Sequence, residues 1–232
     1  MISQKSDTRK LLVVYNPAAG NHTERIREKV ESTLSEKPLT FKFNPTSPNG
    51  NIDFKESAAI SPFTEVIIIG GDGTINAVIN SIDLRIPVAI IPSGTGNDFV
   101  KMLSIGRTIE EQIQTALTGE LIDVDLGICN GHLFANGIGI GFDGQIVEDM
   151  AVKRVPFLRG HAAYYFHVLR ILGGYKEKQF SYEADGKKYD EKLILLTIGN
   201  GSTIGGGFKF IPNSKLYDGY LLNCEIGPLS GF

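Results

Sequence analysis

The strongest constraint on the fold of this chain is a pattern that occurs twice: an apolar run, a glycine loop that contains an aspartate, and a helical segment. The first copy is VIIIGGDGTINAVIN (Val66 to Asn80), and the second is IPVAIIPSGTGNDFVKML (Ile86 to Leu103). Continuous apolar runs of this length are typical of strands buried in a parallel sheet. Because strands that alternate with helices indicate βαβ units, we expect a doubly wound α/β domain in the first half.

Other segments of the first half agree with this expectation. KLLVVYNPAAG, at residues 10–20, is predicted as a buried strand that ends in an Asn-Pro loop. A helix is expected over residues 23–36, because Ile26, Val30 and Leu34 recur at spacings of four. A second short strand is expected within residues 39–50, and a helix over residues 75–82.

The pattern changes near Leu121, beyond which short strands and hairpin turns predominate. EADGKKY contains the Asp-Gly signal of a hairpin, and HAAYYFHVLRILGG (residues 161–174) is predicted as a helix. GIGFDG (residues 139–144) has the spacing of a dinucleotide fingerprint, but without the expected acid it is interpreted as strand glycines and a turn. We expect domains at 1–127 and 128–232, the second β-rich and similar to a β-sandwich.

Composition excludes several classes of protein. The formal net charge of −3 argues against a nucleic-acid partner, which would require a basic surplus. Cys129 and Cys224 are predicted as buried thiols in a reducing compartment. The polar N-terminus does not resemble a signal peptide, and the apolar runs are shorter than the ~18 residues of a membrane span. We expect a cytoplasmic protein whose membrane contact, where it occurs, is transient and at the inner surface.

Three loops, at residues 16–20, 70–74 and 93–98, each follow a predicted strand and precede a predicted helix. In a parallel sheet these loops share one edge, where helix N-termini present free N–H groups that bind phosphate. Asp72 and Asp98 would repel phosphate unless Mg²⁺ lies between them or one acid activates a hydroxyl. The loops therefore favour phosphoryl transfer. A single Gly-Asp-Gly loop would be a plain turn whose aspartate caps the next helix.

Other catalytic signatures do not occur in the sequence. There is no G-x-x-x-x-G-K-[ST] motif, and no serine or cysteine lies in a nucleophile elbow. The four histidines, at positions 22, 132, 161 and 167, lack metal-ligand spacing. Aspartate and threonine are left to carry the chemistry.

The motifs NPAAG, GGDGTINAVIN, PSGTGNDFVK, VDLG and SKLYDGY occur in the order typical of the diacylglycerol kinase catalytic family. The chain resembles the soluble bacterial lipid kinases of this family, which are related to sphingosine kinases and more remotely to NAD kinases. The resemblance implies a two-domain kinase that binds ATP and Mg²⁺ and phosphorylates a lipid alcohol such as diacylglycerol at a membrane surface. A homodimer is compatible with it, although the oligomeric state is left open.

The resemblance also implies site residues. Asp72, Asp98 and Asp125 match catalytic acids around the phosphates and Mg²⁺. Lys215, Asp218 and Tyr220 match a second, structural Mg²⁺ site, to which Asp218 would offer its carboxylate and the other two their backbone carbonyls. The alternative for LYDGY is a simple hairpin turn. ATP-binding positions are matched by Asn16, Pro17, Ala18, Ala19 and Gly20, by Gly70, Gly71, Asp72, Gly73, Thr74, Ile75, Asn76 and Ala77, and by Thr46, Thr95, Gly96 and Asn97.

One departure from the family concerns the C-terminus. The family continues to an Asp-Gly-Glu whose glutamate deprotonates the lipid hydroxyl, whereas this sequence ends at EIGPLSGF. We expect a fragment of a longer protein, with weak or absent catalysis as given. Two alternatives stay open: an NAD-kinase-like enzyme with a soluble acceptor, and a nucleotide-binding regulator without turnover.

The lipid-binding side is less defined. Lys153, Arg154 and Arg159 surround Pro, Phe and Leu ahead of an aromatic helix. This segment either docks on an anionic membrane surface or is a solvated lead-in to a core helix.

Overall fold

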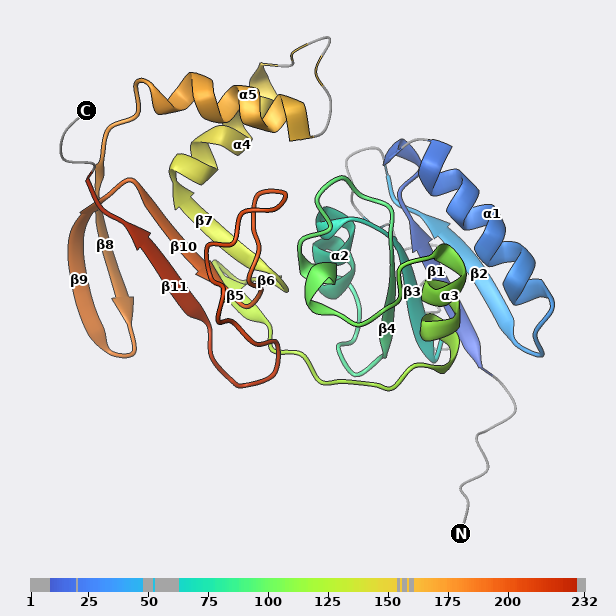
Figure 1. Ribbon diagram of the computed structural model, residues 1–232. Coiled ribbons are helices and arrows are strands. Elements are labelled where there is room, and N and C mark those ends of the chain that lie inside the picture. Colours follow the sequence, from blue (N-terminus) through green and yellow to red (C-terminus); the bar gives the residue numbers. More distant parts are fainter. Residues whose placement is uncertain are drawn as a thin grey trace. The chain divides into compact units, whose positions relative to one another are not determined.

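The computed structural model describes residues 9–19, 21–47, 52, 63–153, 155, 158 and 161–228 (Figure 1). They form two compact units. The first comprises Met1–Val124 and Ile128–Ala135, and the second comprises Asp125–Gly127 and Asn136–Phe232. The chain enters the second unit at Asp125, returns to the first at Ile128 and leaves it again after Ala135. The boundary expected near Gly127 lies within residues 125–135, where the chain passes between the two units.

A four-stranded parallel sheet forms the centre of the first unit, in the order β2-β1-β3-β4. The strands are β1 (Lys10–Tyr15), β2 (Thr40–Pro45), β3 (Glu65–Gly70) and β4 (Val88–Pro92). Because β2 and β3 lie on opposite sides of β1, the strand order reverses between β1 and β3. The helical elements are η1 (Pro17–Ala19), α1 (Asn21–Ser35), α2 (Asp72–Ile79), η2 (Phe99–Met102) and α3 (Ile109–Thr118). The prediction of a doubly wound α/β domain is confirmed.

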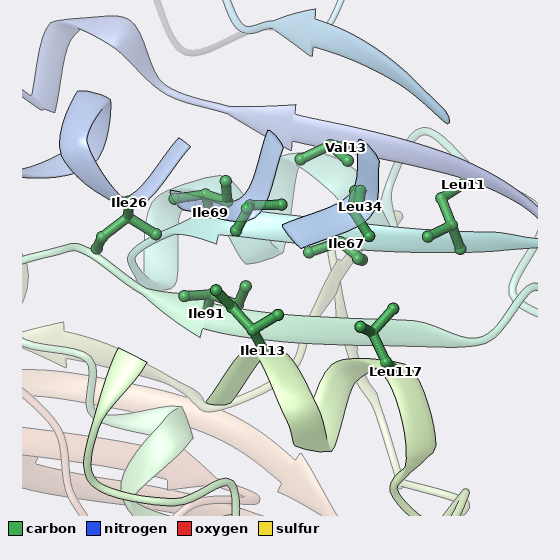
Figure 2. Packing of buried hydrophobic residues seen from close by; sticks show 10 residues of the cluster. Leu11, Val13, Ile26, Leu34, Ile67, Ile69, Ile91, Ile113 and Leu117 are labelled. Atoms are coloured by element: carbon green, nitrogen blue, oxygen red, sulfur yellow. The ribbon is translucent and has the colours of Figure 1, made fainter. Parts of the chain in front are cut away.

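The core of this unit lies where α1 and α3 meet one face of the sheet (Figure 2). α1 buries Ile26, Val30 and Leu34, the three positions that predicted it, and α3 buries Ile113 and Leu117. Full burial of one such side chain is worth about 1.5–3 kcal/mol, so this packing holds the strand ends in place. The sheet contributes Leu11, Val13, Ile67, Ile69 and Ile91.

The second unit contains an antiparallel sheet in the order β11-β10-β7, with β7 at Gly137–Gly141, β10 at Leu195–Gly199 and β11 at Leu222–Ile226. A hairpin of β8 (Lys178–Ala184) and β9 (Lys187–Leu193) and the helices α4 (Phe142–Val152) and α5 (His161–Leu172) belong to the same unit. β5 (Gly127–Cys129) and β6 (His132–Phe134) form a separate two-stranded sheet. The expected β-rich second half is confirmed.

Local expectations in this half are met in part. Asp185 and Gly186 have φ values of 50° and 75°, which is the left-handed backbone that an Asp-Gly hairpin turn requires. The interpretation of GIGFDG as strand and turn was incomplete, because β7 ends at Gly141 and α4 begins at the next residue. A φ of 94° at Gly141 permits this abrupt change of direction, and α4 then buries Ile146 completely.

Two further expectations concern thiols and membranes. Cys129 and Cys224 are free but only half-buried, so the prediction of buried thiols was wrong in degree. Among the described residues, no helix combines the length and apolar character that crossing a membrane requires.

Candidate functional site

The carboxyl ends of the four parallel strands bring the predicted loops of the first unit to one edge of the sheet. Register pairs Gly70 at the end of β3 with Pro92 at the end of β4, and Tyr15 at the end of β1 with Ile69. The loops after β1 and β3 flank the point at which the strand order reverses, and such points bind ligands in open α/β sheets. Proximity of the predicted loops thus follows from the sheet itself.

Gly71 and Gly94 let the loops after β3 and β4 touch backbone to backbone. A Cβ at Gly94 would lie 2.6 Å from the Cα of Gly71 and 2.8 Å from the Oδ1 of Asn97. A Cβ at Gly71 would lie 3.0 Å from the Cα of Gly94. Real Cβ atoms essentially never come closer than 3.0 Å to another atom, and a contact at 3.0 Å is tighter than most. Packing between the two loops therefore explains these two glycines without any ligand.

Asp72 connects the same two loops through its carboxylate. Its Oδ2 accepts the backbone N–H of Asp98 at 3.0 Å, and its Oδ1 accepts that of Phe99 at 3.0 Å. These amides open η2, so Asp72 caps this later helical turn and makes no side-chain cap bond to α2. Each oxygen keeps lone-pair capacity, because a carboxylate has about four acceptor sites.

Asn97 and Asp98 shape the loop that follows β4. Asn97 has a φ of 49°, and its side-chain amide closes the turn by accepting from Gly94 N at 3.0 Å and donating to Gly94 O at 2.8 Å. Asp98 is 4% exposed, and its Oδ1 accepts Lys101 Nζ at 2.6 Å. The acid is therefore buried next to a cation that sequence reasoning had given no role, although Lys101 follows directly in the motif.

The N-terminus of α2 offers free donors beside these acids. In the described part of the chain, the amides of Asp72 and Gly73 have no hydrogen-bond acceptor. A Cβ at Gly73 would meet no atom within 4 Å, in contrast to those at Gly71 and Gly94. Gly73 is thus the glycine of this loop that faces open space at a positive helix end.

Residues after β1 and β2 complete the edge. Asn16 Oδ1 accepts the amide of Ala18 at 2.9 Å, which sets the small-residue turn of η1, where Pro17, Ala18 and Ala19 are exposed. Thr46 donates its amide to Tyr15 O at 2.8 Å, and its buried hydroxyl has no hydrogen-bond partner among the described residues. An unpaired buried hydroxyl at this edge is available to a ligand. Gly20 lies outside the described residues.

Several predicted positions serve the fold itself. Ile75 is buried in the core, and Thr74 packs its side chain over Gly70. Asn76 Oδ1 accepts the amide of Ala135 at 3.3 Å, so its side chain holds the segment after β6. Sequence reasoning also missed Thr23, whose hydroxyl donates to Ser93 Oγ at 2.9 Å in a buried contact between α1 and the loop after β4. A threonine on the apolar face of a helix was the available signal.

The second unit contains the remaining predicted acids. Asp125 Oδ2 accepts the amide of Gly219 at 2.7 Å, and Asp125 N donates to Leu216 O at 2.7 Å. Asp218 Oδ1 accepts the amide of Tyr220 at 3.2 Å, and Gly219 has a φ of 77°. The structure therefore joins Asp125 to the turn at residues 215–220, whereas Asp72 and Asp98 belong to the first unit. Across the described ranges, no three His, Cys, Asp or Glu side chains gather as a metal cluster.

One buried acid in the second unit was not singled out in the sequence. Asp143, in the first turn of α4, is 8% exposed, and within the part of the chain that the structure describes its Oδ2 has no hydrogen-bond partner. Burial raises the pKa of this carboxyl above its usual value, because the charged form loses hydration.

Two family models match this chain, one in each half. Residues 10–129 match the diacylglycerol kinase catalytic domain, and residues 136–226 match the YegS C-terminal NAD kinase beta sandwich-like domain. The chain is 31% identical to a diacylglycerol kinase of Bacillus subtilis over 89% of its length and 70% of that protein. It is 27% identical to one of Staphylococcus carnosus, over 90% and 69%. A crystal structure of a diacylglycerol kinase from Bacillus anthracis superimposes with a TM-score of 0.72 at 28% identity, covering 94% of this chain and 74% of that one.

Proposed function

The chain belongs to the diacylglycerol kinase catalytic domain family of lipid kinases, and on this basis we propose that it transfers the γ-phosphoryl group of ATP to the hydroxyl of a diacylglycerol-like lipid. The observation that carries the proposal is the joined pair of loops after β3 and β4. There, two acids lie beside free amides at the start of α2. This combination fits a phosphate chain that is accompanied by a cation.

Phosphates would bind at the start of α2, where the free amides of Asp72 and Gly73 point out of the helix. Gly73 leaves the approach unobstructed, and the exposed Thr95 and the half-buried Gly96 lie in the neighbouring loop. The loop after β1 and the unpaired hydroxyl of Thr46 extend the site along the edge of the sheet, where the rest of the nucleotide would lie.

Mg²⁺ fits the acids of the first unit. Asp72 presents two oxygens with remaining lone pairs, and Asp98 lies directly beside it. One or two carboxylates together with substrate phosphates form the usual magnesium environment in kinases. When bound, the ion would neutralise phosphate charge. Asp72 also keeps the loop after β4 in place, so its carboxylate orients the site as well as serving the cation.

A second cation site is proposed at the turn of residues 215–220. Asp125 and Asp218 each use one oxygen on a backbone amide there, and the described residues leave the other oxygens to a cation. The backbone carbonyls of Lys215 and Tyr220 would add ligands of the hard type that Mg²⁺ prefers. Because this turn holds Asp125, the ion would stabilise the second unit and orient this acid.

The lipid would be presented at a membrane surface. α5 exposes Tyr165, Phe166, Leu169 and Leu172 on one side, and Leu169 is 72% exposed. Among the basic residues nearby, Arg154 and Arg159 lie outside the described residues, whereas Lys153 is exposed. An apolar helix face flanked by cations suits the surface of an anionic bilayer.

Transfer of labelled phosphate tests the proposal. ATP labelled at the γ-position is supplied with Mg²⁺ and either extracted bacterial lipid, defined diacylglycerol or NAD, and the label is followed by chromatography. Label in the lipid fraction supports the proposal. Label in NAD alone would replace it with an NAD-kinase-like function. Calorimetric ATP binding without transfer to any acceptor would identify a nucleotide-binding regulator.

A further inference from the structure

The second unit contains an open pocket of about 650 Å³ between α4, α5 and the start of β8. Its lining residues belong neither to the proposed nucleotide site nor to the two proposed cation sites. The sequence did not predict it, because α4, the unexpected helix, contributes Gln145 and Asp149 to its wall. Lining residues are Gln145, Asp149, Lys153, Arg170, Ile171 and residues 174–178.

The wall of the pocket is basic. Four basic and two acidic side chains line it, so its formal net charge is +2, whereas the whole chain carries −3. Charge of this sign concentrated in one hollow attracts anions from solution or from a charged surface.

One of the two acidic side chains of the pocket is already neutralised, and the other is Glu177. Asp149 forms an ion pair with Arg170, lies 3.4 Å from Lys153 Nζ, and meets His167 Nδ1 at 2.6 Å. Three groups that carry or can carry positive charge therefore surround one carboxylate.

Lys176 and Lys178 provide the remaining charge. Within the described ranges neither forms an ion pair, and Lys178 Nζ lies 5.4 Å from the centre of the Tyr175 ring. Two ammonium groups that form no ion pair with a described carboxylate therefore line the pocket, and they leave donors for an incoming anion. Ammonium groups bind phosphate as point charges with several donors.

Part of the pocket wall is apolar, and the helix that supplies it is apolar on its other side as well. Ile171 and the Tyr175 ring line it, and Ile171 belongs to α5, whose opposite side exposes Tyr165, Phe166 and Leu169. A soluble anion would make no use of an exposed apolar helix beside its site. A lipid would use both features, because its phosphate is charged and its chains are apolar.

We propose that this pocket binds the phosphate group of an anionic phospholipid, while the exposed side of α5 contacts the acyl region of the same membrane. The pocket would thereby hold the protein at the surface that presents its substrate. This inference relies on the proposed lipid kinase function only for the choice of a lipid as the source of phosphate.

Binding of a monomeric lipid tests the pocket without ATP, acceptor or turnover. Dihexanoylphosphatidylglycerol, kept below its micelle concentration, is titrated into the protein in a calorimeter. We expect saturable binding to one site. In the double variant Lys176→Gln/Lys178→Gln, affinity should fall roughly 25-fold, since one basic residue near a lipid charge contributes about fivefold. The matched control is Lys187→Gln/Lys188→Gln, which removes two exposed lysines of β9 outside the pocket and should bind as the wild type does.

Two glycine substitutions test the pocket by blocking it, without changing its charge. Gly174 lines the pocket and Gly173 does not, yet a Cβ at either would meet nothing within 4 Å. Gly174→Tyr should place a ring over the pocket and weaken binding at least tenfold, whereas Gly173→Tyr should not. Circular dichroism melts establish that each variant folds.

The outcomes separate the possibilities. If the control Lys187→Gln/Lys188→Gln weakened lipid binding as much as Lys176→Gln/Lys178→Gln, diffuse charge would explain binding and the proposal would fail. It would also fail if Gly173→Tyr weakened lipid binding as much as Gly174→Tyr, because a general surface effect would then be the cause. Inorganic phosphate serves as a second ligand. The four variants are also tested for binding to vesicles of phosphatidylglycerol and phosphatidylcholine. If inorganic phosphate bound as tightly as the lipid, and all four variants bound these vesicles as the wild type does, the natural ligand would be soluble phosphate and the proposal would fail. Loss of lipid transfer in the kinase assay would not affect this result.

Discussion

The carboxylate of Asp72 accepts the backbone amide of Asp98 at 3.0 Å, across a separation of 26 residues. A second bond, from Phe99 N at 3.0 Å, uses the other oxygen. The loop after β3 is thus tied to the loop after β4 by the same acid that the family resemblance places beside the phosphates. One side chain both builds the site and stands in it, so substitutions here change stability and ligand binding together.

Asp72→Asn should reduce phosphoryl transfer more than about 100-fold, because a charge beside the phosphates is lost. The chain should still fold, but with a free energy of unfolding lower by about 1–3 kcal/mol. Asparagine can accept only one of the two amides and turns an N–H donor toward the other. Urea denaturation and the labelled-phosphate assay measure the two effects. Asp83→Asn is the control, since its exposed, solvent-screened pairing with Arg85 should contribute little to stability. Wild-type transfer by Asp72→Asn would remove this acid from the site.

Gly73→Ala and Gly94→Ala should separate the glycines that serve the ligand from those that serve packing. Gly94→Ala forces a Cβ to within 2.6 Å of the Gly71 Cα, so unfolding should become easier by roughly 1–3 kcal/mol. Gly73→Ala should leave stability unchanged or raise it by up to about 1 kcal/mol, because its Cβ enters open space on a helix. ATP affinity, measured by calorimetry, should nevertheless fall in Gly73→Ala. Unchanged affinity there would contradict phosphate binding at the start of α2.

Removal of divalent cations should lower the thermal stability of the second unit. A cation at a hundredfold excess over its Kd stabilises the folded state by about 2.7 kcal/mol, and EDTA should abolish this gain. Asp125→Asn should melt at the same temperature with Mg²⁺ as with EDTA, because the proposed site at residues 215–220 is lost. The measurement is a calorimetric melt of each protein in both buffers. A magnesium-dependent gain that persists in Asp125→Asn and disappears in Asp218→Asn would exclude Asp125 as a ligand.

Asp143→Asn should alter the pH dependence of stability. Burial raises the pKa of this carboxyl in the folded state above its value in the unfolded chain. The contribution of Asp143 to the free energy of unfolding is therefore fully present below the pKa of the unfolded chain, about 3.9. This contribution is lost as the pH rises through the pKa of the folded state. Wild type and variant should be similarly stable at the acid end, and the variant should be the more stable at neutral pH. Urea titrations across this range compare them, and parallel profiles would show that the burial of this acid has no energetic effect.

The sequence predicted the architecture of the first unit because its signals are local. The spacing of Ile26, Val30 and Leu34 places them on one helix face whatever the surroundings, and the run before Gly70 is too apolar for a surface strand. Strands that alternate with helices then place the loops at one edge. Proximity of Asp72 to the loop of Asp98 could therefore be expected from the pattern alone.

Tertiary structure alone decided how those residues are used. Asp72 bonds to amides 26 and 27 residues away instead of capping its own helix, and Gly71 and Gly94 serve contact between loops. Asn76 holds Ala135, and Asp125 is tied to the turn at Gly219. A local pattern carries no record of such partners, because a hydrogen bond between distant residues depends on the distances set when the strands pack. Sequence determined which chemical groups gather at the edge of the sheet, and packing determined which of them are engaged and which are left to a ligand.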